Sequence, residues 1–322
     1  MREISVEVER FPIAGSFTIS RGSRTEAVVV TVRIREGQDE GLGECVPYAR
    51  YGESVESVVA QVESIRERLR SGARRDELLT LLPAGAARNA VDCALWDLEA
   101  RHKGVSVAKL AGRGPLKSVV TCYTLSLGTP DSMREAAAAA AHRPLLKVKL
   151  GGDGDPERIA AVREGAPRSR LVVDANEAWR PHNLAPNLAA CTRAGVELVE
   201  QPLPAGDDSG LKGTRSDIAI CADESIHDFA SLAHLPDWYD AINIKLDKTG
   251  GLTDALKLLD AAKARGLKVM VGCMLGTSLA MRPAVILAQQ ADVIDLDGPL
   301  LLAKDRDNPL RYEGSLLIPD ES

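Results

Sequence analysis

The chain has 322 residues, of which 45% are hydrophobic and 27% charged, close to the averages of soluble globular proteins. This length exceeds what one hydrophobic core usually supports, so two domains are expected, and the composition excludes a disordered chain. With 40 basic and 46 acidic residues the formal charge is −6, which argues against nucleic acid or a membrane surface as partner and leaves small molecules.

The first third of the chain predicts an α+β layer. Its predicted strands are residues 3–11 and 27–36, and its predicted helices are 56–69 and 86–101. The connecting segments 19–25 and 46–54 are rich in glycine, tyrosine and charged residues, unlike ordinary turns. We expect these two loops to cover a site.

From residue 119 onward, short β-branched runs alternate with longer amphipathic stretches, which is typical of repeated βα units around a parallel sheet. The predicted strands are 119–127, 145–150, 170–174, 196–200, 218–222, 241–245, 268–272 and 293–295. Between them lie helix candidates such as 130–141 and 252–265. The regular spacing predicts an eight-stranded TIM barrel, and the tail after the last strand shows no clear eighth helix.

The sequence predicts neither a signal peptide nor a membrane span. Residues 1–11 lack the basic start and long apolar run of a signal peptide. No stretch reaches the roughly 18 consecutive apolar residues of a membrane span. The six cysteines form no Cys-x-x-Cys pair and stand in apolar surroundings, as reduced core residues do. We therefore expect a cytoplasmic protein.

Two lysines two residues apart, Lys147 and Lys149, end the second predicted barrel strand. Side chains at this spacing share a face of a strand, so both ammonium groups would point into the barrel near its catalytic rim. Like charges placed together lower the pKa of an ammonium group, which would allow one to act as a neutral base. The alternative is a solvated pair on an edge strand.

Three carboxylates follow the next three predicted strands: Asp174, Glu200 and Asp223. A single acid after a strand is usually a helix cap. Three in register favour a metal site, and oxygen ligands of this kind suit Mg²⁺.

Lys245 ends the sixth predicted strand, which stands opposite the second in an eight-stranded barrel. Lys245 and Lys149 would then face each other across the pore, one on each face of a bound carbon acid. A lysine that snorkels to the rim is the alternative, and it makes that opposition a coincidence.

Asp295 and Asp297 follow the eighth predicted strand and also share a face. They lie away from the third to fifth strands, so we do not expect them to be metal ligands. An acidic pair here would bind a cationic group such as an α-ammonium. A role in the turn before Gly298 and Pro299 is the alternative.

These residues resemble the enolase superfamily, specifically its muconate-lactonizing branch and, within it, the L-Ala-D/L-Glu epimerases. The resemblance spans almost the whole chain. Its barrel motifs are Lys147-Val148-Lys149, Asp174-Ala175-Asn176, Glu200-Gln201-Pro202, Ala222-Asp223-Glu224-Ser225, the segment 243–251 and Asp295-Leu296-Asp297-Gly298-Pro299. The N-terminal motifs are Ser20-Arg21-Gly22-Ser23-Arg24, Gly43-Glu44-Cys45 and Arg50-Tyr51-Gly52-Glu53-Ser54.

The resemblance implies an α/β fold, a modified TIM barrel of type (β/α)7β with an α+β N-terminal capping domain. The capping domain would be residues 1–114, completed by the C-terminal segment 299–322. The barrel, residues 115–298, would carry the catalytic site.

It also implies a Mg²⁺-dependent dipeptide epimerase, most closely an L-Ala-D/L-Glu epimerase that inverts the α-carbon of the C-terminal residue. Lys149 and Lys245 would exchange the proton in a two-base reaction through a metal-stabilised enolate, and Lys147 would help to hold the substrate carboxylate. Asp295 and Asp297 would hold the dipeptide's amino terminus. Arg24 would pair with an acidic side chain of the substrate.

The sequence leaves several functions open. An N-acylamino-acid racemase, a muconate cycloisomerase or an o-succinylbenzoate synthase would use the same metal and lysines. A non-catalytic small-molecule-binding barrel belongs to another class, although it has no use for two opposed bases. The sequence also leaves a homo-oligomer open, and a role in peptidoglycan recycling rests on the family alone.

Overall fold

The capping layer begins with a three-stranded antiparallel sheet in the order β1-β2-β3, formed by Glu3–Ile19, Gly22–Glu36 and Asp39–Cys45. The computed structural model describes residues 1–214 and 216–320. Both predicted strands of this layer are confirmed, but the β1–β2 ladder continues to the pair Ile19↔Gly22. The prediction of a loop at 19–25 is therefore wrong. The register shift between Pro12 and Phe17 breaks the alternation, which hides the strand beyond it.

Helices cover one face of this sheet. They are η1 (Ala49–Tyr51), α1 (Val55–Ser64), α2 (Arg66–Arg70), α3 (Arg75–Leu81), α4 (Ala86–Lys103) and α5 (Val107–Leu110). The predicted helix 56–69 is divided at Ile65 into α1 and α2. Helix α4 packs directly on β3, and valines and isoleucine of β2 complete the core between them.

The barrel is an eight-stranded parallel sheet in the order β12-β11-β10-β9-β8-β7-β6-β5. From β5 to β12 its strands are Tyr123–Leu125, Leu145–Lys149, Arg170–Asp174, Val196–Glu200, Ala219–Ala222, Ala241–Ile244, Lys268–Val271 and Val293–Ile294. The Cys122 amide donates to the carbonyl of Ile294 at 2.8 Å, which ties β12 to the start of β5 and joins the two ends of the sheet. The predicted TIM-type fold is confirmed.

The outer helices are α6 (Pro130–Ala139), α7 (Asp155–Gly165), α8 (Pro181–Arg193), α10 (Leu252–Ala264) and α11 (Ser278–Ala288). The short elements are η2 (Ser209–Leu211), η3 (Ala230–His234), α9 (Leu246–Thr249) and α12 (Gly298–Leu301). The units that start with β8 and β9 thus carry only 3₁₀ turns in the described part of the chain. After β12 the chain forms the four-residue α12, in keeping with the weak helix signal of the tail.

The C-terminal segment contacts both layers. Strand β13 (Arg311–Glu313) pairs with β14 (Leu316–Ile318), and β14 pairs with β4 (Val119–Val120). The predicted strand 119–127 is therefore divided into β4 and β5. Arg306 instead reaches the capping sheet, where its guanidinium contacts Glu9 and Glu44 at 2.7 Å. The predicted capping segment 299–322 ends outside the described residues, and the domain boundaries stay a prediction.

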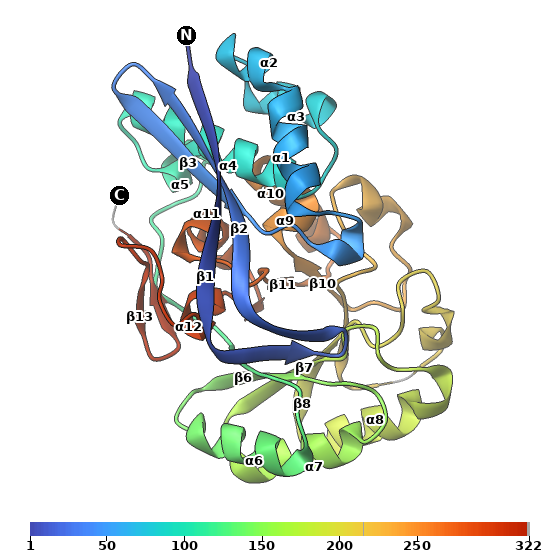
Figure 1. Ribbon diagram of the computed structural model, residues 1–322. Helices are drawn as coiled ribbons and strands as arrows, with labels where there is room; N and C mark the ends of the chain where they lie inside the picture. The colour runs from blue at the N-terminus through green and yellow to red at the C-terminus, as the bar shows by residue number, and fades with distance from the viewer. Residues whose placement is uncertain (215, 321–322) are drawn as a thin grey trace.

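Figure 1 shows how the two layers meet. Capping helices α1–α3 lie at the top of that view and α6–α8 at the bottom, and the long β1–β2 hairpin bends across the barrel between them. Among the described residues no helix combines the length and the apolar character that a bilayer crossing requires.

Candidate active site

Eight buried side chains fill the barrel interior near the amino ends of its strands. They are Cys122, Leu145, Val172, Leu198, Cys221, Ala241, Met270 and Val293, one for each strand in turn. Side chains alternate along a strand, so the residue two positions later points into the same interior, one layer nearer the carboxyl ends. This apolar layer is the floor of the site.

The next layer is polar. Its members, each two residues beyond a floor residue, are Thr124, Lys147, Asp174, Glu200, Asp223, Asn243, Gly272 and Asp295. Asp174 and Glu200 have no solvent exposure, and Lys147 and Asp223 are 1% exposed. Every acid predicted to bind metal lies in this one layer, which the period of two along the strands explains.

Lysine ammonium groups stand between the acids. Lys147 Nζ lies 2.6 Å from Glu200 Oε2, 2.7 Å from Asp295 Oδ2 and 3.4 Å from Asp174 Oδ2. Lys245 Nζ lies 2.6 Å from Asp223 Oδ2 and 3.6 Å from Glu200 Oε1. With the ammonium groups interposed, no three His, Cys, Asp or Glu side chains within residues 1–214 and 216–320 form a group that could hold a metal.

The donor set nevertheless fits a hard divalent cation in its chemistry. Asp174 and Glu200 are paired in register on neighbouring strands, and Asp223 follows the next strand. The buried Glu200 Oε2 makes no hydrogen bond of ordinary geometry, although Lys147 Nζ is close to it. Carboxylate oxygens from three consecutive strands, one of them unsatisfied, are the ligands that Mg²⁺ prefers.

The electrostatics differ from the sequence-based expectation, in which neighbouring like charges lower the pKa of the strand-end lysines. Burial does act in that direction on Lys147, but Asp295, Glu200 and Asp174 outweigh it and raise its pKa well above the usual value. The same balance, with Asp223 as the main partner, raises the pKa of Lys245. The expectation, made for the pair after β6, is wrong for Lys147 because carboxylates from other strands lie within hydrogen-bonding distance of its ammonium group.

Lys149 and Lys245 face each other across the barrel. Strands β6 and β10 are separated by three strands in the closed sheet of eight, which places them on opposite walls. Both side chains are buried, at 7% and 6% exposure, and both line a cavity of about 90 Å³ beneath the capping layer. Lys149 Nζ also lies 2.6 Å from Asp174 Oδ2. The two predicted bases therefore border one cavity.

The two acids after β12, Asp295 and Asp297, contact different partners. Asp295 accepts from Lys147, and its second oxygen, Oδ1, is buried and has no hydrogen-bond partner among the described residues. Asp297 Oδ2 accepts from the Thr124 amide at 2.6 Å. Burial, together with the neighbouring Asp295, raises the pKa of Asp297 to about 7. The pair thus has capacity for a further donor, as an ammonium group would supply.

Arg24 lies at the mouth of this cavity, on strand β2. It lines the space together with Arg21, Ile19 and Tyr51 of the capping layer, and its guanidinium carbon lies 5.7 Å from the centroid of the Tyr48 ring. The segments predicted to cover the site do so. The hairpin tip supplies three of these residues, and residues 46–54 supply the two tyrosines.

Sequence reasoning did not assign three residues that support the acids. Asn243 donates to Glu200 Oε1 at 2.7 Å from the amide Nδ2. Lys248, 2% exposed, donates to Asp223 Oδ1 at 2.6 Å. A Cβ at Gly272 would stand 2.7 Å from Asn243 Oδ1, so only glycine leaves room for that amide. The period of two would have identified Asn243, because it precedes Lys245 by two residues on the same predicted strand, 241–245.

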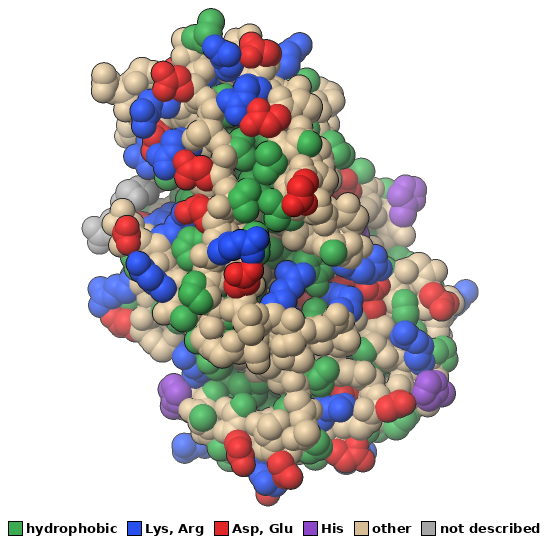
Figure 2. All heavy atoms as spheres, in the orientation of Figure 1, with side chains coloured by type: hydrophobic (Ala, Val, Ile, Leu, Met, Phe, Trp, Pro, Cys, Tyr) green, Lys and Arg blue, Asp and Glu red, His purple; other side chains and the backbone are tan. Residues whose placement is uncertain are grey.

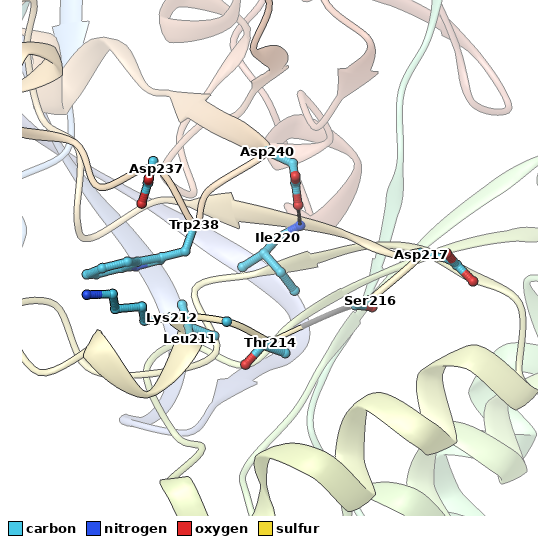
Figure 3. Close-up of a pocket in the computed structure, with 10 residues that line it drawn as sticks. Leu211, Lys212, Thr214, Ser216, Asp217, Ile220, Asp237, Trp238 and Asp240 are labelled. Carbon is cyan, nitrogen blue, oxygen red and sulfur yellow. Dashed lines mark hydrogen bonds between the residues drawn. The ribbon is translucent and has the colours of Figure 1, made fainter.

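A larger hollow of about 760 Å³ lies elsewhere, between the connections that flank β9 (Figure 3). Its lining includes Lys212, Asp217, Trp238 and Asp240. None of the residues predicted to carry the chemistry lines it, so it is separate from the active-site cavity.

Comparison with known proteins agrees with the geometry. Residues 1–112 match the N-terminal domain model of the mandelate racemase and muconate lactonizing enzyme family, and residues 131–321 match the enolase C-terminal domain-like model. The chain is 48% identical to L-Ala-D/L-Glu epimerase of Escherichia coli K12, over 97% of this chain and 98% of the relative. It is 44% identical to N-acetyl-D-glutamate racemase of a Pseudoalteromonas species, over 91% and 94%.

Solved structures share the fold over almost the whole chain. An enolase family member from Agrobacterium tumefaciens, homologous to dipeptide epimerases and bound to sodium and L-Ala-L-Glu, has a TM-score of 0.98 and 53% identity, covering 99% of this chain and 98% of that chain. A dipeptide epimerase from Enterococcus faecalis V583, complexed with Mg and L-Leu-L-Tyr, has a TM-score of 0.92 and 28% identity, covering 99% and 97%. The chain therefore belongs to the enolase superfamily, in the mandelate racemase and muconate lactonizing enzyme family.

Proposed function

We propose that this protein is a Mg²⁺-dependent dipeptide epimerase, most closely an L-Ala-D/L-Glu epimerase. One observation carries the proposal. Two buried lysines from opposite barrel walls border a single small cavity directly above a layer of carboxylates. A reaction that removes a proton from one face of a carbon and returns it to the other needs two such groups.

Asp174, Glu200 and Asp223 would hold the Mg²⁺. When bound, the ion supplies positive charge that offsets the charge developing on the substrate carboxylate as the α-proton leaves. The Mg found with a dipeptide in the Enterococcus relative supports this choice of metal.

Lys149 and Lys245 would move the proton. One, as the neutral amine, would take the α-proton from its own face, and the other, as an ammonium, would donate a proton from the opposite face. Mg²⁺ held by Asp223 and Glu200 would offset the carboxylate charge that raises the pKa of Lys245. Their roles exchange for the reverse direction, so both epimers are substrates. Lys147, held by Glu200 and Asp295, supplies a fixed positive charge beside the position of the substrate carboxylate.

The substrate's ends would be fixed by charge. Asp295 and Asp297 would receive the amino terminus of the dipeptide, which determines the α-carbon that lies between the lysines. Arg24, at the cavity mouth, would pair with an acidic side chain such as that of glutamate. The dipeptide in the Agrobacterium structure ends in glutamate, which supports this assignment.

A dipeptide screen in D₂O with Mg²⁺ tests reaction and substrate class together. We expect L-Ala-L-Glu and L-Ala-D-Glu each to gain one deuterium at the glutamate α-carbon and to interconvert, as read by mass spectrometry and NMR. Omission of Mg²⁺ should abolish both changes. Absence of mass gain across the dipeptides would contradict the proposal.

N-acylamino-acid racemization is the second candidate function, and the 44% identity to N-acetyl-D-glutamate racemase favours it. Its substrate has the same carboxylates but no free ammonium. Asp297→Asn should therefore slow dipeptide epimerization while leaving any activity on N-acetylglutamate unchanged. The two relatives in E. coli and Pseudoalteromonas are an epimerase and a racemase by name, which argues against a cycloisomerase, a synthase or a silent binding barrel.

We also propose a cytoplasmic location and, from the similarity to L-Ala-D/L-Glu epimerases alone, a role in peptidoglycan recycling. All six cysteines are free in the structure and five are buried, which supports a reducing compartment. The net negative charge supports small-molecule rather than nucleic-acid or membrane partners.

Size-exclusion chromatography with light scattering would show whether the protein forms a homo-oligomer.

A further inference from the structure

One carboxylate of the barrel binds both segments that cover the cavity. Glu177 lies just beyond β7, three residues after Asp174. Its Oε1 and Oε2 accept from Arg50 Nη2 and Nε, both at 2.7 Å, in a two-point pair. Its Oε2 also lies 3.3 Å from Arg21 Nη1. Arg21 is at the tip of the β1–β2 hairpin and Arg50 is in η1, so one side chain joins two separate capping segments.

The barrel holds Glu177 in place. Its Oε1 accepts from the Ala205 amide at 2.8 Å, and its own amide donates to the Gln201 carbonyl at 2.9 Å. Its φ of 66° follows the 44° of Asn176, a left-handed conformation that non-glycine residues seldom adopt. Such backbone conformations persist where the surrounding contacts enforce them. The Glu177 side chain is only 10% exposed, so the surrounding groups and not bulk water fix its position.

The hairpin tip makes further contacts with the barrel next to Glu177. Arg21 donates to the Asn176 carbonyl at 2.9 Å and to the Tyr48 hydroxyl at 3.0 Å. It also lies 2.9 Å from Glu224 Oε1, beside Asp223. Ser20 Oγ donates to the Asn176 carbonyl at 3.1 Å. In Figure 2, blue basic and red acidic side chains lie side by side where the hairpin meets the barrel.

We propose that Glu177 is a positioning residue that latches both capping segments over the reaction cavity. Ile19 and Arg21 of one segment and Tyr48 and Tyr51 of the other line the cavity. Releasing Arg50 and weakening Arg21 would therefore open two walls at once. Glu177 itself does not line the cavity, so it acts through these side chains and not on the substrate.

The latch predicts local opening that is measurable without any substrate. In Glu177→Ala and Glu177→Gln, amide hydrogen exchange of segments 16–26 and 46–54 should rise about tenfold or more, because charged hydrogen bonds to both segments are lost. The matched control is Glu197→Gln, which removes a comparable two-point pair with Arg170 on the outside of the barrel. That variant should leave both segments at the wild-type exchange rate.

Two further variants guard against a simple folding defect. Arg50→Lys keeps the charge but loses the planar two-point geometry, so it should raise exchange in 46–54 more than in 16–26. The exchanged pair Arg50→Glu with Glu177→Arg should restore part of the protection lost in Glu177→Ala. Unchanged exchange of both segments in the Glu177 variants, or a change of equal size in Glu197→Gln, would overturn the latch.

Catalysis provides an independent readout, which rests on the proposed epimerase function. Because bound substrate can itself close the segments, Glu177→Gln should raise KM about tenfold and change kcat less. A loss of kcat with KM unchanged would overturn the proposal. The exchange experiment requires no substrate, so it remains valid if the reaction differs from dipeptide epimerization, and the wild-type D₂O assay tests that reaction separately.

Discussion

At the scale of single residues, the two opposed lysines should act on different epimers. Lys149→Ala should abolish α-proton exchange from one epimer of the dipeptide more than from the other, and Lys245→Ala should show the reverse preference. Deuterium incorporation into each epimer, followed by NMR, measures this. Lys263→Ala, which removes a surface ion pair with Asp292, is the control. Equal residual exchange from both epimers in either variant would contradict the two-base scheme.

Asn243 orients a proposed metal ligand and does not contact the substrate in our scheme. Removing its 2.7 Å hydrogen bond to Glu200 in Asn243→Ala should weaken Mg²⁺ binding about 10- to 100-fold. Isothermal titration with Mg²⁺ gives the dissociation constant directly. Asn187→Ala is the matched control, because Asn187 is also buried, at 1% exposure, but lies on the outer helix α8. Equal Mg²⁺ affinity in the two variants would count against the assignment.

At the scale of elements, the contact between α4 and β3 depends on a missing side chain. A Cβ at Gly43 would stand 2.0 Å from the Ala90 carbonyl oxygen, and this neighbour is helix backbone that cannot rotate aside. Gly43→Ala should therefore lower the free energy of unfolding by about 1–3 kcal/mol, because α4 has to shift from the sheet. Urea denaturation measures the change.

The control for this close contact is Gly114→Ala. No atom lies within 4 Å of a Cβ at Gly114, so its stability should match the wild type within about 0.5 kcal/mol. If Gly43→Ala were as stable as Gly114→Ala, the packing of α4 on β3 would not depend on the small residue.

At the scale of the whole molecule, a buried acid at the junction of the two layers should make stability depend on pH. Asp247 of α9 accepts from the Val46 amide and from Asn89 of α4. Burial is the main cause that raises its pKa from 3.8 to about 7. The folded state then holds this proton more tightly than the unfolded chain, so its contribution to stability falls as pH rises from about 4 to about 7.

Asp247→Asn should remove that contribution, since an amide oxygen can accept the same two hydrogen bonds. Urea denaturation between pH 5 and 7 should give a wild-type free energy of unfolding that declines more steeply than that of the variant, by up to about 1.4 kcal/mol per pH unit. The effects of all other titrating groups are shared and cancel in the difference. Parallel curves for the two proteins would contradict the raised pKa.

Much of the fold was readable from the sequence because it depends on local periodicity. The barrel strands were predicted to within a few residues, since β-branched runs and their spacing are local features. The β1–β2 hairpin beyond Pro12 was missed because a bulge interrupts the alternation. The division of 119–127 was missed because β4 is defined by its distant partner β14.

The sequence by itself determined which side chains share the barrel interior, because a period of two places Lys147, Asp174, Glu200 and Asp223 in one layer once the strands are known. Only the tertiary structure decided how those charges are balanced. The pKa of Lys147 rises because acids from other strands surround it, and Glu177 binds two arginines more than a hundred residues away. Such contacts depend on which strands and loops become neighbours when the sheet closes, and no local pattern records that.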